Sequence, residues 1–281
     1  MTGHRHHKVK KIISLGISLS LVIALSLLFG QVLGNLYLDN LAEDLAVPGT
    51  GATTGGSNGS KIKVLRLKPL TYYTINVAGF SEYEQAVEVG KILAEQKLPA
   101  VITGSSPHYV RLGFLNNAGQ LARLAQRITV DGQKAEVSEA DINSISFKFP
   151  ENDSYAAEVL APFIGEVSLS LEKALILNRD LDCTSDEMKR LKPMFGELGQ
   201  EVLALASRGT EIAAQLAEID SPHTPYLRDL AAALYNWGQS LKELDAINWN
   251  NNQLLYSQQQ TLVVIEEYQR LLQTTNLQDK R

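Results

Sequence analysis

Cysteine is almost absent from this chain of 281 residues, which contains only Cys183. A single thiol cannot close an intramolecular disulfide, so the fold must be held by packing alone, whatever the redox state of its compartment. Residues 151–281 also lack the short motifs of common catalytic sites, among them His-Glu-x-x-His, Gly-x-Ser-x-Gly and the phosphate-binding loop. From these absences we predict a protein that is not an enzyme and that has no cofactor and no metal site.

Basic residues are scarce in the C-terminal part of the chain. Residues 151–281 hold 11 Lys and Arg against 20 Asp and Glu, a net charge of −9, whereas residues 61–150 hold 11 against 8, a net charge of +3. Opposite net charges in neighbouring segments are typical of two modules with different partners. Apolar residues make up 44% of the whole chain, which is enough for a globular core.

Charge is missing from the stretch between Lys11 and Asp39, whose apolar part spans residues 12–34. A helix rises about 1.5 Å per residue, so this segment is long enough to cross a hydrocarbon core of about 30 Å. The alternative is a cleaved signal peptide, whose apolar region would be shorter, at about 7–15 residues. We therefore predict a retained transmembrane helix at residues 12–34.

The flanks of this segment predict its orientation. Residues 1–11 are rich in lysine and the residues after 34 begin with acidic groups, and positive flanks stay on the cytoplasmic side. Residues 35–60 form a linker, because residues 47–60 contain five glycines and no charge. We therefore predict a single-pass membrane protein with its N-terminus inside and the remaining domains outside.

Residues 61–150 contain an internal repeat, in which residues 73–93 align with residues 108–128 at an offset of 35. Ser81 and Asn116, both frequent helix N-caps, occupy matching places in the two halves. Each half has an alternating strand, a helix and a short apolar strand. The predicted order β-α-β-β-α-β is that of an α+β fold with a four-stranded antiparallel sheet and both helices on one face.

Strand alternation then assigns side chains to the two faces of this sheet. Four apolar residues should point toward the helices: Ile75, Val77, Val110 and Leu112. Five residues with rings or polar groups should point to the helix-free face: Tyr72, Thr74, Asn76, Tyr109 and Arg111. Such a face could stack and hydrogen-bond a ring-shaped ligand, or it could be a solvated face with cross-strand tyrosine pairs.

The segments YTINVAGFS (73–81) and YVRLGFL (109–115) resemble the two strand-to-helix turns of the SPOR domain, a sporulation-related repeat of bacterial cell-envelope proteins. The resemblance covers about residues 63–141. It implies binding of septal peptidoglycan, at glycan strands stripped of their peptide stems, through the helix-free face of the sheet. It also implies a role in cell division or sporulation, at the cytoplasmic membrane and enriched at the septum.

Particular residues carry this resemblance. The first-strand glutamine of the family falls on Asn76, its third-strand aromatic residue on Tyr109 and its arginine on Arg111. The chain departs from the family pattern at Asn76 itself, at Gly79 in place of serine, and at Phe114 in place of proline. The resemblance thus implies a glycan site at Asn76, Tyr109 and Arg111, and strand alternation adds Thr74 and Tyr72 to the predicted site.

Residues 151–281 predict a helical bundle of unknown role. Leucines and other apolar residues recur at spacings of three and four in four segments, which is typical of amphipathic helices joined by short connections. One such stripe is Leu227, Leu230, Leu234, Trp237, Leu241 and Leu244. We expect this module to have a protein partner.

Two alternatives stand beside glycan binding. A non-enzymatic interaction scaffold would keep the SPOR-like sheet without its glycan affinity, as the replaced serine at Gly79 favours. An RNA-recognition module has the same element order and sheet aromatics. A net charge of +3 is modest for that task, so we predict no nucleic-acid partner.

Overall fold

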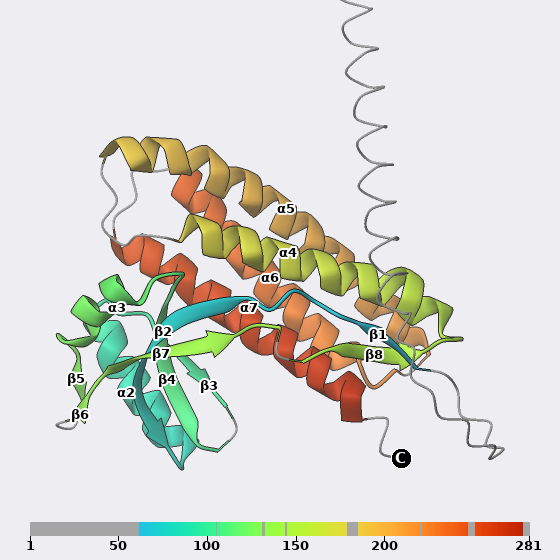
Figure 1. Ribbon diagram of the computed structural model, residues 1–281, viewed down its shortest axis with the longest axis horizontal. Coiled ribbons are helices and arrows are strands. Elements are labelled where there is room, and N and C mark those ends of the chain that lie inside the picture. Colours follow the sequence, from blue (N-terminus) through green and yellow to red (C-terminus); the bar gives the residue numbers. More distant parts are fainter. Residues whose placement is uncertain are drawn as a thin grey trace, which may run out of the picture. The chain divides into compact units, whose positions relative to one another are not determined.

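The computed structural model describes residues 62–104, 106–130, 133–143, 145–178, 185–219, 221–246 and 251–277 (Figure 1). The predicted basic flank (1–11), membrane span (12–34) and linker (35–60) lie outside the described residues, and so does Cys183. All described residues belong to one compact unit.

None of the described helices is long and apolar enough to cross a bilayer. This finding contradicts the predicted single-pass topology and, with it, the placement of the protein in the cytoplasmic membrane. The described helices have exposed faces rich in polar and charged residues, as the alternation of buried and exposed positions along them shows. The segment on which the prediction depended, residues 12–34, is not among the described residues.

The described residues form eight strands, six α-helices and one π-helical turn. The strands are β1 (Ile62–Leu65), β2 (Thr71–Phe80), β3 (Val101–Thr103), β4 (His108–Leu115), β5 (Thr129–Val130), β6 (Gln133–Lys134), β7 (Glu136–Asp141) and β8 (Phe147–Pro150). The helices are α2 (Tyr83–Glu95), α3 (Ala118–Ala125), η1 (Ala156–Leu160), α4 (Ala161–Leu177), α5 (Ser185–Glu218), α6 (Thr224–Ala246) and α7 (Asn251–Leu277).

The central sheet has four antiparallel strands in the order β3-β4-β2-β7. Ile75 pairs with Leu112 on β4, and Asn76 pairs with Arg111. Ile75, Val77, Val110 and Leu112 are all buried, and α2 and α3 pack against the strands that carry them. The apolar alternation of β2 and β4 thus fixes which face of the sheet meets these two helices.

A bulge in β4 shifts the side chains at its C-terminal end. Gly113 has a φ of +79°, a backbone conformation that residues with a Cβ atom rarely adopt, and the register between β4 and β2 changes at this residue. A Cβ on Gly113 would also lie 2.6 Å from Leu121 Cδ2 of α3. Because the bulge inserts one residue, Phe114 lies on the face opposite Leu112 and contacts the ring of Tyr72.

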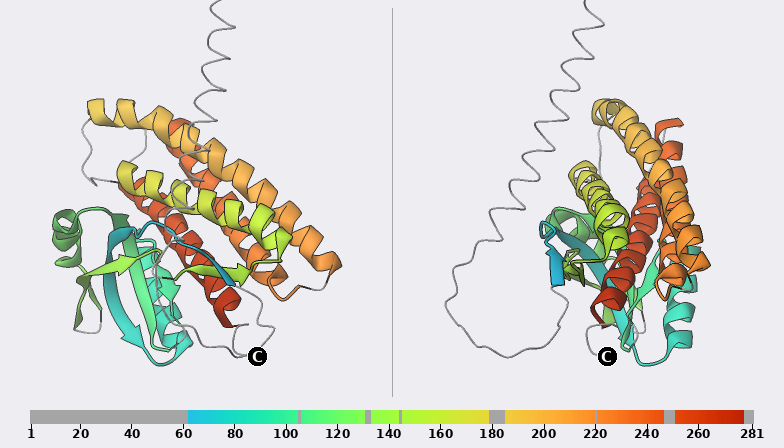
Figure 2. Two further views of the ribbon diagram at one scale, coloured as in Figure 1. Left: turned by 45° about the vertical axis from the view of Figure 1, so that its right-hand side comes forward. Right: turned by 90° about the vertical axis from the view of Figure 1, so that its right-hand side faces the viewer.

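The C-terminal helices α4, α5, α6 and α7 lie side by side (Figure 1 and Figure 2). The predicted stripe of α6 is buried throughout, with Leu227, Leu234 and Trp237 fully enclosed. Pro162 lies in the first turn of α4, directly after the turn η1, where its missing N–H leaves few helical bonds unmade. Burial of these stripes between neighbouring helices holds the bundle together.

Helix α7 packs against the central sheet as well as against the bundle. It contacts β3, β4 and β8, and β8 pairs with β1 in a separate two-stranded ribbon. The buried residues of the sheet and of the bundle therefore form one continuous hydrophobic core. The physical cause is α7, which is apolar on more than one side: Leu262 and Ile265 are buried on one side, and Val264 and Leu271 are buried on another.

The predicted fold class is wrong in this respect. We expected an α+β domain with one helix-free face, placed between a transmembrane helix and a separate all-α bundle. The described residues instead form one α+β unit in which a bundle helix covers part of that face. The predicted boundary between residues 61–150 and 151–281 falls between β8 and η1.

Candidate functional site

Three polar or aromatic side chains gather on the face of the sheet opposite α2 and α3. Asn76 on β2 lies directly across from Arg111 on β4, and Arg111 Nε donates a hydrogen bond of 3.0 Å to Asn76 Oδ1. The guanidinium carbon of Arg111 lies 5.3 Å from the centroid of the Tyr109 ring, within the range of a cation–π contact. All three side chains are half-buried. The sheet therefore presents a ring beside a fixed set of donors.

Because Gly79 has no side chain, the Tyr109 ring has room to lie against β2. The two residues are paired across the strands, and a Cβ on Gly79 would come 3.0 Å from Tyr109 Cε1. A serine at this place, as in the family pattern, would need the ring to move. Glycine in place of serine at position 79 is therefore compatible with the observed position of the Tyr109 ring.

We call Asn76, Gly79, Tyr109, Arg111 and Glu136 the open part of this face. Glu136 pairs with Asn76 on the neighbouring strand β7 and is exposed, as Gly79 is. We call Tyr72, Thr74, Thr103 and Phe114 the covered part, because each has 5% or less of its surface exposed.

Helix α7 closes the covered part with hydrogen bonds to the backbone of the sheet. Phe114 N donates to Gln258 Oε1 at 3.1 Å, and Gln259 Nε2 donates to the carbonyl of Ala100 at 2.8 Å. Gln258 Nε2 donates in turn to Asn178 Oδ1, just after α4. These contacts satisfy backbone groups that would otherwise be buried without partners.

The polar groups of Tyr72 and Thr74, in the covered part, are shielded from solvent. Burial raises the pKa of the Tyr72 hydroxyl above its ordinary value, and the nearby Arg111 cation opposes the shift. The Thr74 hydroxyl is already engaged, since it donates to the carbonyl of Leu112 at 3.1 Å. Neither group is free to meet a ligand in this arrangement.

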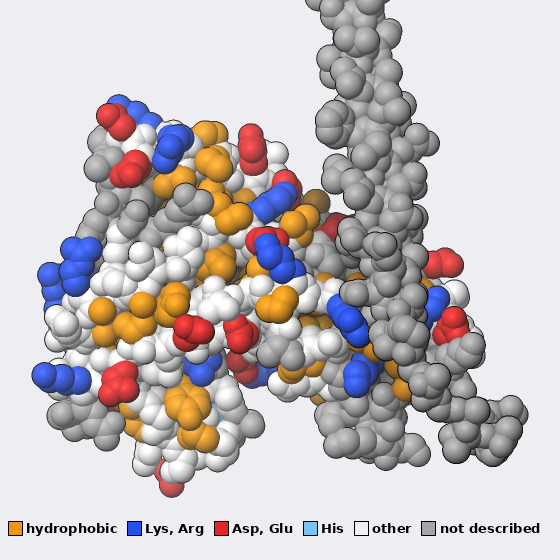
Figure 3. Space-filling view, viewed as in Figure 1, with side chains coloured by type: hydrophobic (Ala, Val, Ile, Leu, Met, Phe, Trp, Pro, Cys, Tyr) orange, Lys and Arg blue, Asp and Glu red, His pale blue; other side chains and the backbone are white. Residues whose placement is uncertain are grey.

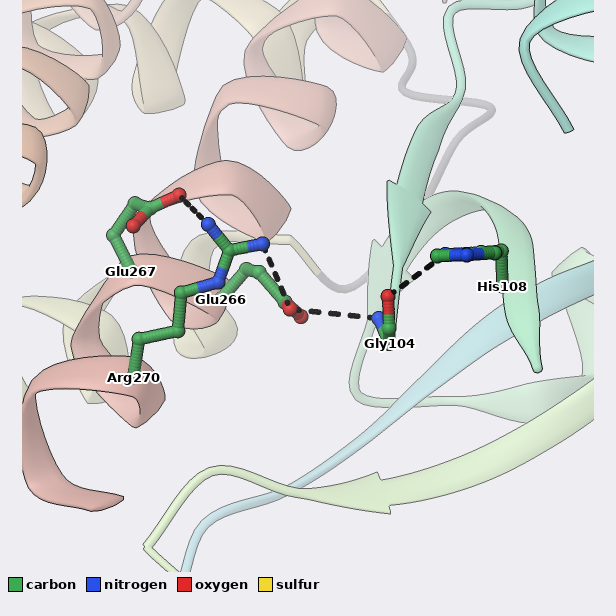
Figure 4. A network of polar contacts seen from close by, with 5 residues as sticks. All are labelled: Gly104, His108, Glu266, Glu267 and Arg270. Atoms are coloured by element: carbon green, nitrogen blue, oxygen red, sulfur yellow. Dashed lines mark hydrogen bonds and ion pairs between the residues drawn. The ribbon is translucent and has the colours of Figure 1, made fainter. Parts of the chain in front are cut away.

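A polar network lies where α7 meets the end of β3 (Figure 4). Glu266 Oε1 accepts from Gly104 N at 3.4 Å and from Arg270 Nη2 at 3.5 Å, while Arg270 Nη1 donates to Glu267 Oε1 at 3.0 Å. His108 Nδ1 lies 3.1 Å from the carbonyl oxygen of Gly104. The network thus places the Glu266 carboxylate at the end of β3, which is the strand paired with β4 at Tyr109.

The structure divides the five residues predicted to bind glycan, of which three follow from the resemblance and two, Tyr72 and Thr74, from strand alternation. It brings Asn76, Tyr109 and Arg111 together in the open part and buries Tyr72 and Thr74 in the covered part. Sequence reasoning did not single out Thr103 or Glu266, which border the open part. Alternation along β3 could have placed Thr103 on this face, but no local pattern links Glu266 to a sheet more than 100 residues away.

Other parts of the molecule offer weaker sites. Among the described residues, no group of His, Cys, Asp and Glu could hold a metal ion. A groove between α5 and α6 is lined mainly by small residues, including Ala206, Ala231 and Ala232, with Tyr235 beside them. On the face shown in Figure 3, hydrophobic groups and charges of both signs are interspersed.

Comparison with protein-family models, with curated proteins and with solved structures returns no match. The resemblance to SPOR domains therefore rests on the two segments 73–81 and 109–115 and stays a prediction.

Proposed function

We propose that this protein is a non-enzymatic carbohydrate-binding protein whose open part binds peptidoglycan glycan stripped of its peptide stems. The observation that carries the proposal is the arrangement of Asn76, Tyr109 and Arg111. Sugars present C–H faces that pack on aromatic rings, and hydroxyl and acetamido groups that need directed hydrogen bonds. Tyr109 supplies the ring, and the Arg111 guanidinium, oriented by Asn76, supplies several donors in a fixed plane.

The resemblance of residues 63–141 to SPOR domains supports the choice of ligand. The three positions that align with the family's glutamine, aromatic residue and arginine are Asn76, Tyr109 and Arg111, and these three lie together and are half-exposed. A role in cell division or sporulation would follow from recognition of such glycan. The helical bundle would then bind a separate protein partner.

A second candidate function is a protein-interaction scaffold whose sheet no longer binds glycan. The burial of Tyr72 and Thr74 favours this alternative, because two of the five residues predicted to bind glycan are enclosed. Binding to cell walls distinguishes the two functions, because a scaffold of this kind should not bind glycan, with or without peptide stems.

The test is binding of the purified full-length chain to cell-wall sacculi before and after amidase treatment. The parent should bind amidase-treated sacculi more strongly. Arg111→Ala and Tyr109→Ala should each lower the affinity about tenfold to hundredfold, because a partner group on the ligand loses an interaction worth about 1–3 kcal/mol. Arg111→Lys should recover only part of the loss, because an ammonium group lacks the planar fork of donors.

Matched controls remove the same side chains elsewhere. Arg123→Ala on α3 and Tyr235→Ala on α6 both alter exposed residues outside this face, and both should bind like the parent. If the Tyr109 and Arg111 variants bind treated sacculi as well as the parent does, the sheet-face site is wrong. If the parent binds no sacculi, the scaffold function takes its place.

A further inference from the structure

We infer that α7 restricts the open part to a short carbohydrate of one or two sugar rings, rather than a long glycan strand laid across the whole sheet. This inference rests on the proposed function and concerns the length of ligand that the site can use. A short ligand is expected because α7 closes two borders of the open part and leaves the border at β7 free.

The border toward the C-terminal end of β4 is closed by packed side chains. Tyr72 and Phe114 are 3% and 0% exposed, and their rings lie 5.2 Å apart between centroids. Gln258 bonds the backbone of Phe114 from above. A sugar chain that extends along the strands from Arg111 in this direction would meet this layer.

The border toward β3 is closed by the polar network of α7. Thr103 pairs with Tyr109 across the strands, yet it is only 5% exposed. Beyond it, Glu266 accepts the hydrogen bond of Gly104 N. A chain that extends across the strands from Tyr109 toward β3 would therefore meet helix α7 and a carboxylate.

Helix α7 is a fixed wall rather than a movable lid. Leu262, Ile265 and Tyr268 are buried in the core, and the Tyr268 hydroxyl donates to Asn143 Oδ1 at 3.2 Å. Swinging the helix away would expose this apolar surface and leave several buried polar groups unpaired. Glycan binding cannot be expected to displace it.

What remains open lies on β4 and β2, with β7 beside β2 only as far as Asn76. At about 4.8 Å between strands and about 3.3 Å per residue, this area measures roughly 10 Å across the strands at Asn76 and roughly 10 Å along β2 from Asn76 to Gly79. That area suits one or two pyranose rings stacked near Tyr109, with entry from the β7 edge. Further sugars would extend into solvent and add few contacts.

The test compares glycan fragments of different length. Amidase-stripped glycan is cut with a muramidase and separated into disaccharides and hexasaccharides, and each is titrated calorimetrically into the full-length chain. We expect dissociation constants within about fivefold of each other, because the longer fragment gains only alternative registers on the same site. Tyr109→Ala should weaken both fragments equally, and Tyr235→Ala should weaken neither.

Each outcome is decisive. A hexasaccharide that binds more than about fivefold tighter than the disaccharide, or binding that is detected only with long strands, overturns the short site and leaves the proposed function standing, since an affinity gain above about 1 kcal/mol needs contacts outside the open part. Absence of binding to every fragment and to stripped sacculi refutes the proposed function, and the inference fails with it.

Discussion

The open and covered parts of the sheet face share strands β2 and β4, but their polar groups bond to different partners. In the open part, Arg111 bonds to Asn76 and lies over Tyr109, so side chains of the sheet hold one another. In the covered part, sheet backbone bonds to Gln258 and Gln259 of α7. One face can therefore serve both as a ligand surface and as an anchor for a helix. Which part serves which role depends on the path of α7 and on the bulge that places Phe114 under it.

The strongest test of this comparison replaces one aromatic residue in each part. Phe114→Ala should lower the free energy of unfolding by about 3–5 kcal/mol, because it opens a cavity under α7. Tyr109→Ala should lower it by about 1 kcal/mol or less, because its ring is half in water. Urea unfolding of both variants measures the difference. Equal losses would mean that the open part is also structural core.

Removal of the α7 contact at Phe114 should have the next largest effect. Gln258→Ala leaves the Phe114 N–H and the Asn178 side chain without this partner, and we expect a loss of about 2 kcal/mol in unfolding free energy. Gln239→Ala, at an exposed position on α6, is the control and should change stability by less than about 0.5 kcal/mol. A neutral Gln258→Ala would show that α7 does not depend on this bond to the sheet.

Two threonines of the covered part should respond in opposite directions. Among the described residues, the buried Thr103 Oγ1 has no hydrogen-bond partner, so Thr103→Val should stabilise the protein by about 1 kcal/mol. Thr74→Val removes a hydroxyl that donates to Leu112 and should destabilise it by about 1 kcal/mol. Thermal unfolding of the two variants and the parent measures both stability changes. A destabilising Thr103→Val would point to a bound water or ligand at that hydroxyl.

The smallest predicted effect is a pH dependence at the α7 network. Burial raises the pKa of Glu267, with the carboxylates of Asp229 and Glu266 adding to the shift and Arg270 opposing it. Because the folded-state pKa exceeds the unfolded value, this group stabilises the fold below its unfolded pKa, and that stability is lost as the pH rises through the folded pKa. Glu267→Gln should therefore match the parent in acid and gain about 0.5 kcal/mol near pH 7, a typical size for such a site.

Urea unfolding at several pH values checks this expectation. Glu243→Gln, an exposed position on α6, provides the control and should show no such divergence from the parent. If Glu267→Gln is instead less stable near pH 7, the ion pair with Arg270 outweighs the cost of burying the carboxylate.

Local patterns located several elements and part of the site. The alternating residues of β2 and β4 predicted which side chains meet α2 and α3, and Ile75, Val77, Val110 and Leu112 are indeed buried. The same alternation placed Asn76 opposite the helices, and the structure pairs it with Arg111. Such patterns work because a strand has a period of two, which each sequence segment carries within itself.

Long-range packing was beyond the reach of those patterns. The apolar stripe of α7 predicted an amphipathic helix, and the further apolar residues on its other side do not specify whether that side packs on a helix or on a sheet. The bulge at Gly113 moved Phe114 to the other face by one inserted residue, a change that a glycine in the sequence does not specify. The predicted helix-free face was wrong for these two reasons.

The amino-acid sequence by itself determined the strand-to-helix units and the sidedness of Ile75, Val77, Val110 and Leu112, because each follows from a short period. The register that pairs Asn76 with Arg111 includes irregularities in both strands, so it came only with the tertiary structure. The tertiary structure alone decided that Tyr72 and Thr74 are enclosed, that Glu266 borders the site and that the open part is small. Those outcomes depend on contacts between residues more than 100 positions apart. Their energy comes from burying apolar surface, which has no direction of its own and therefore leaves no motif in either segment.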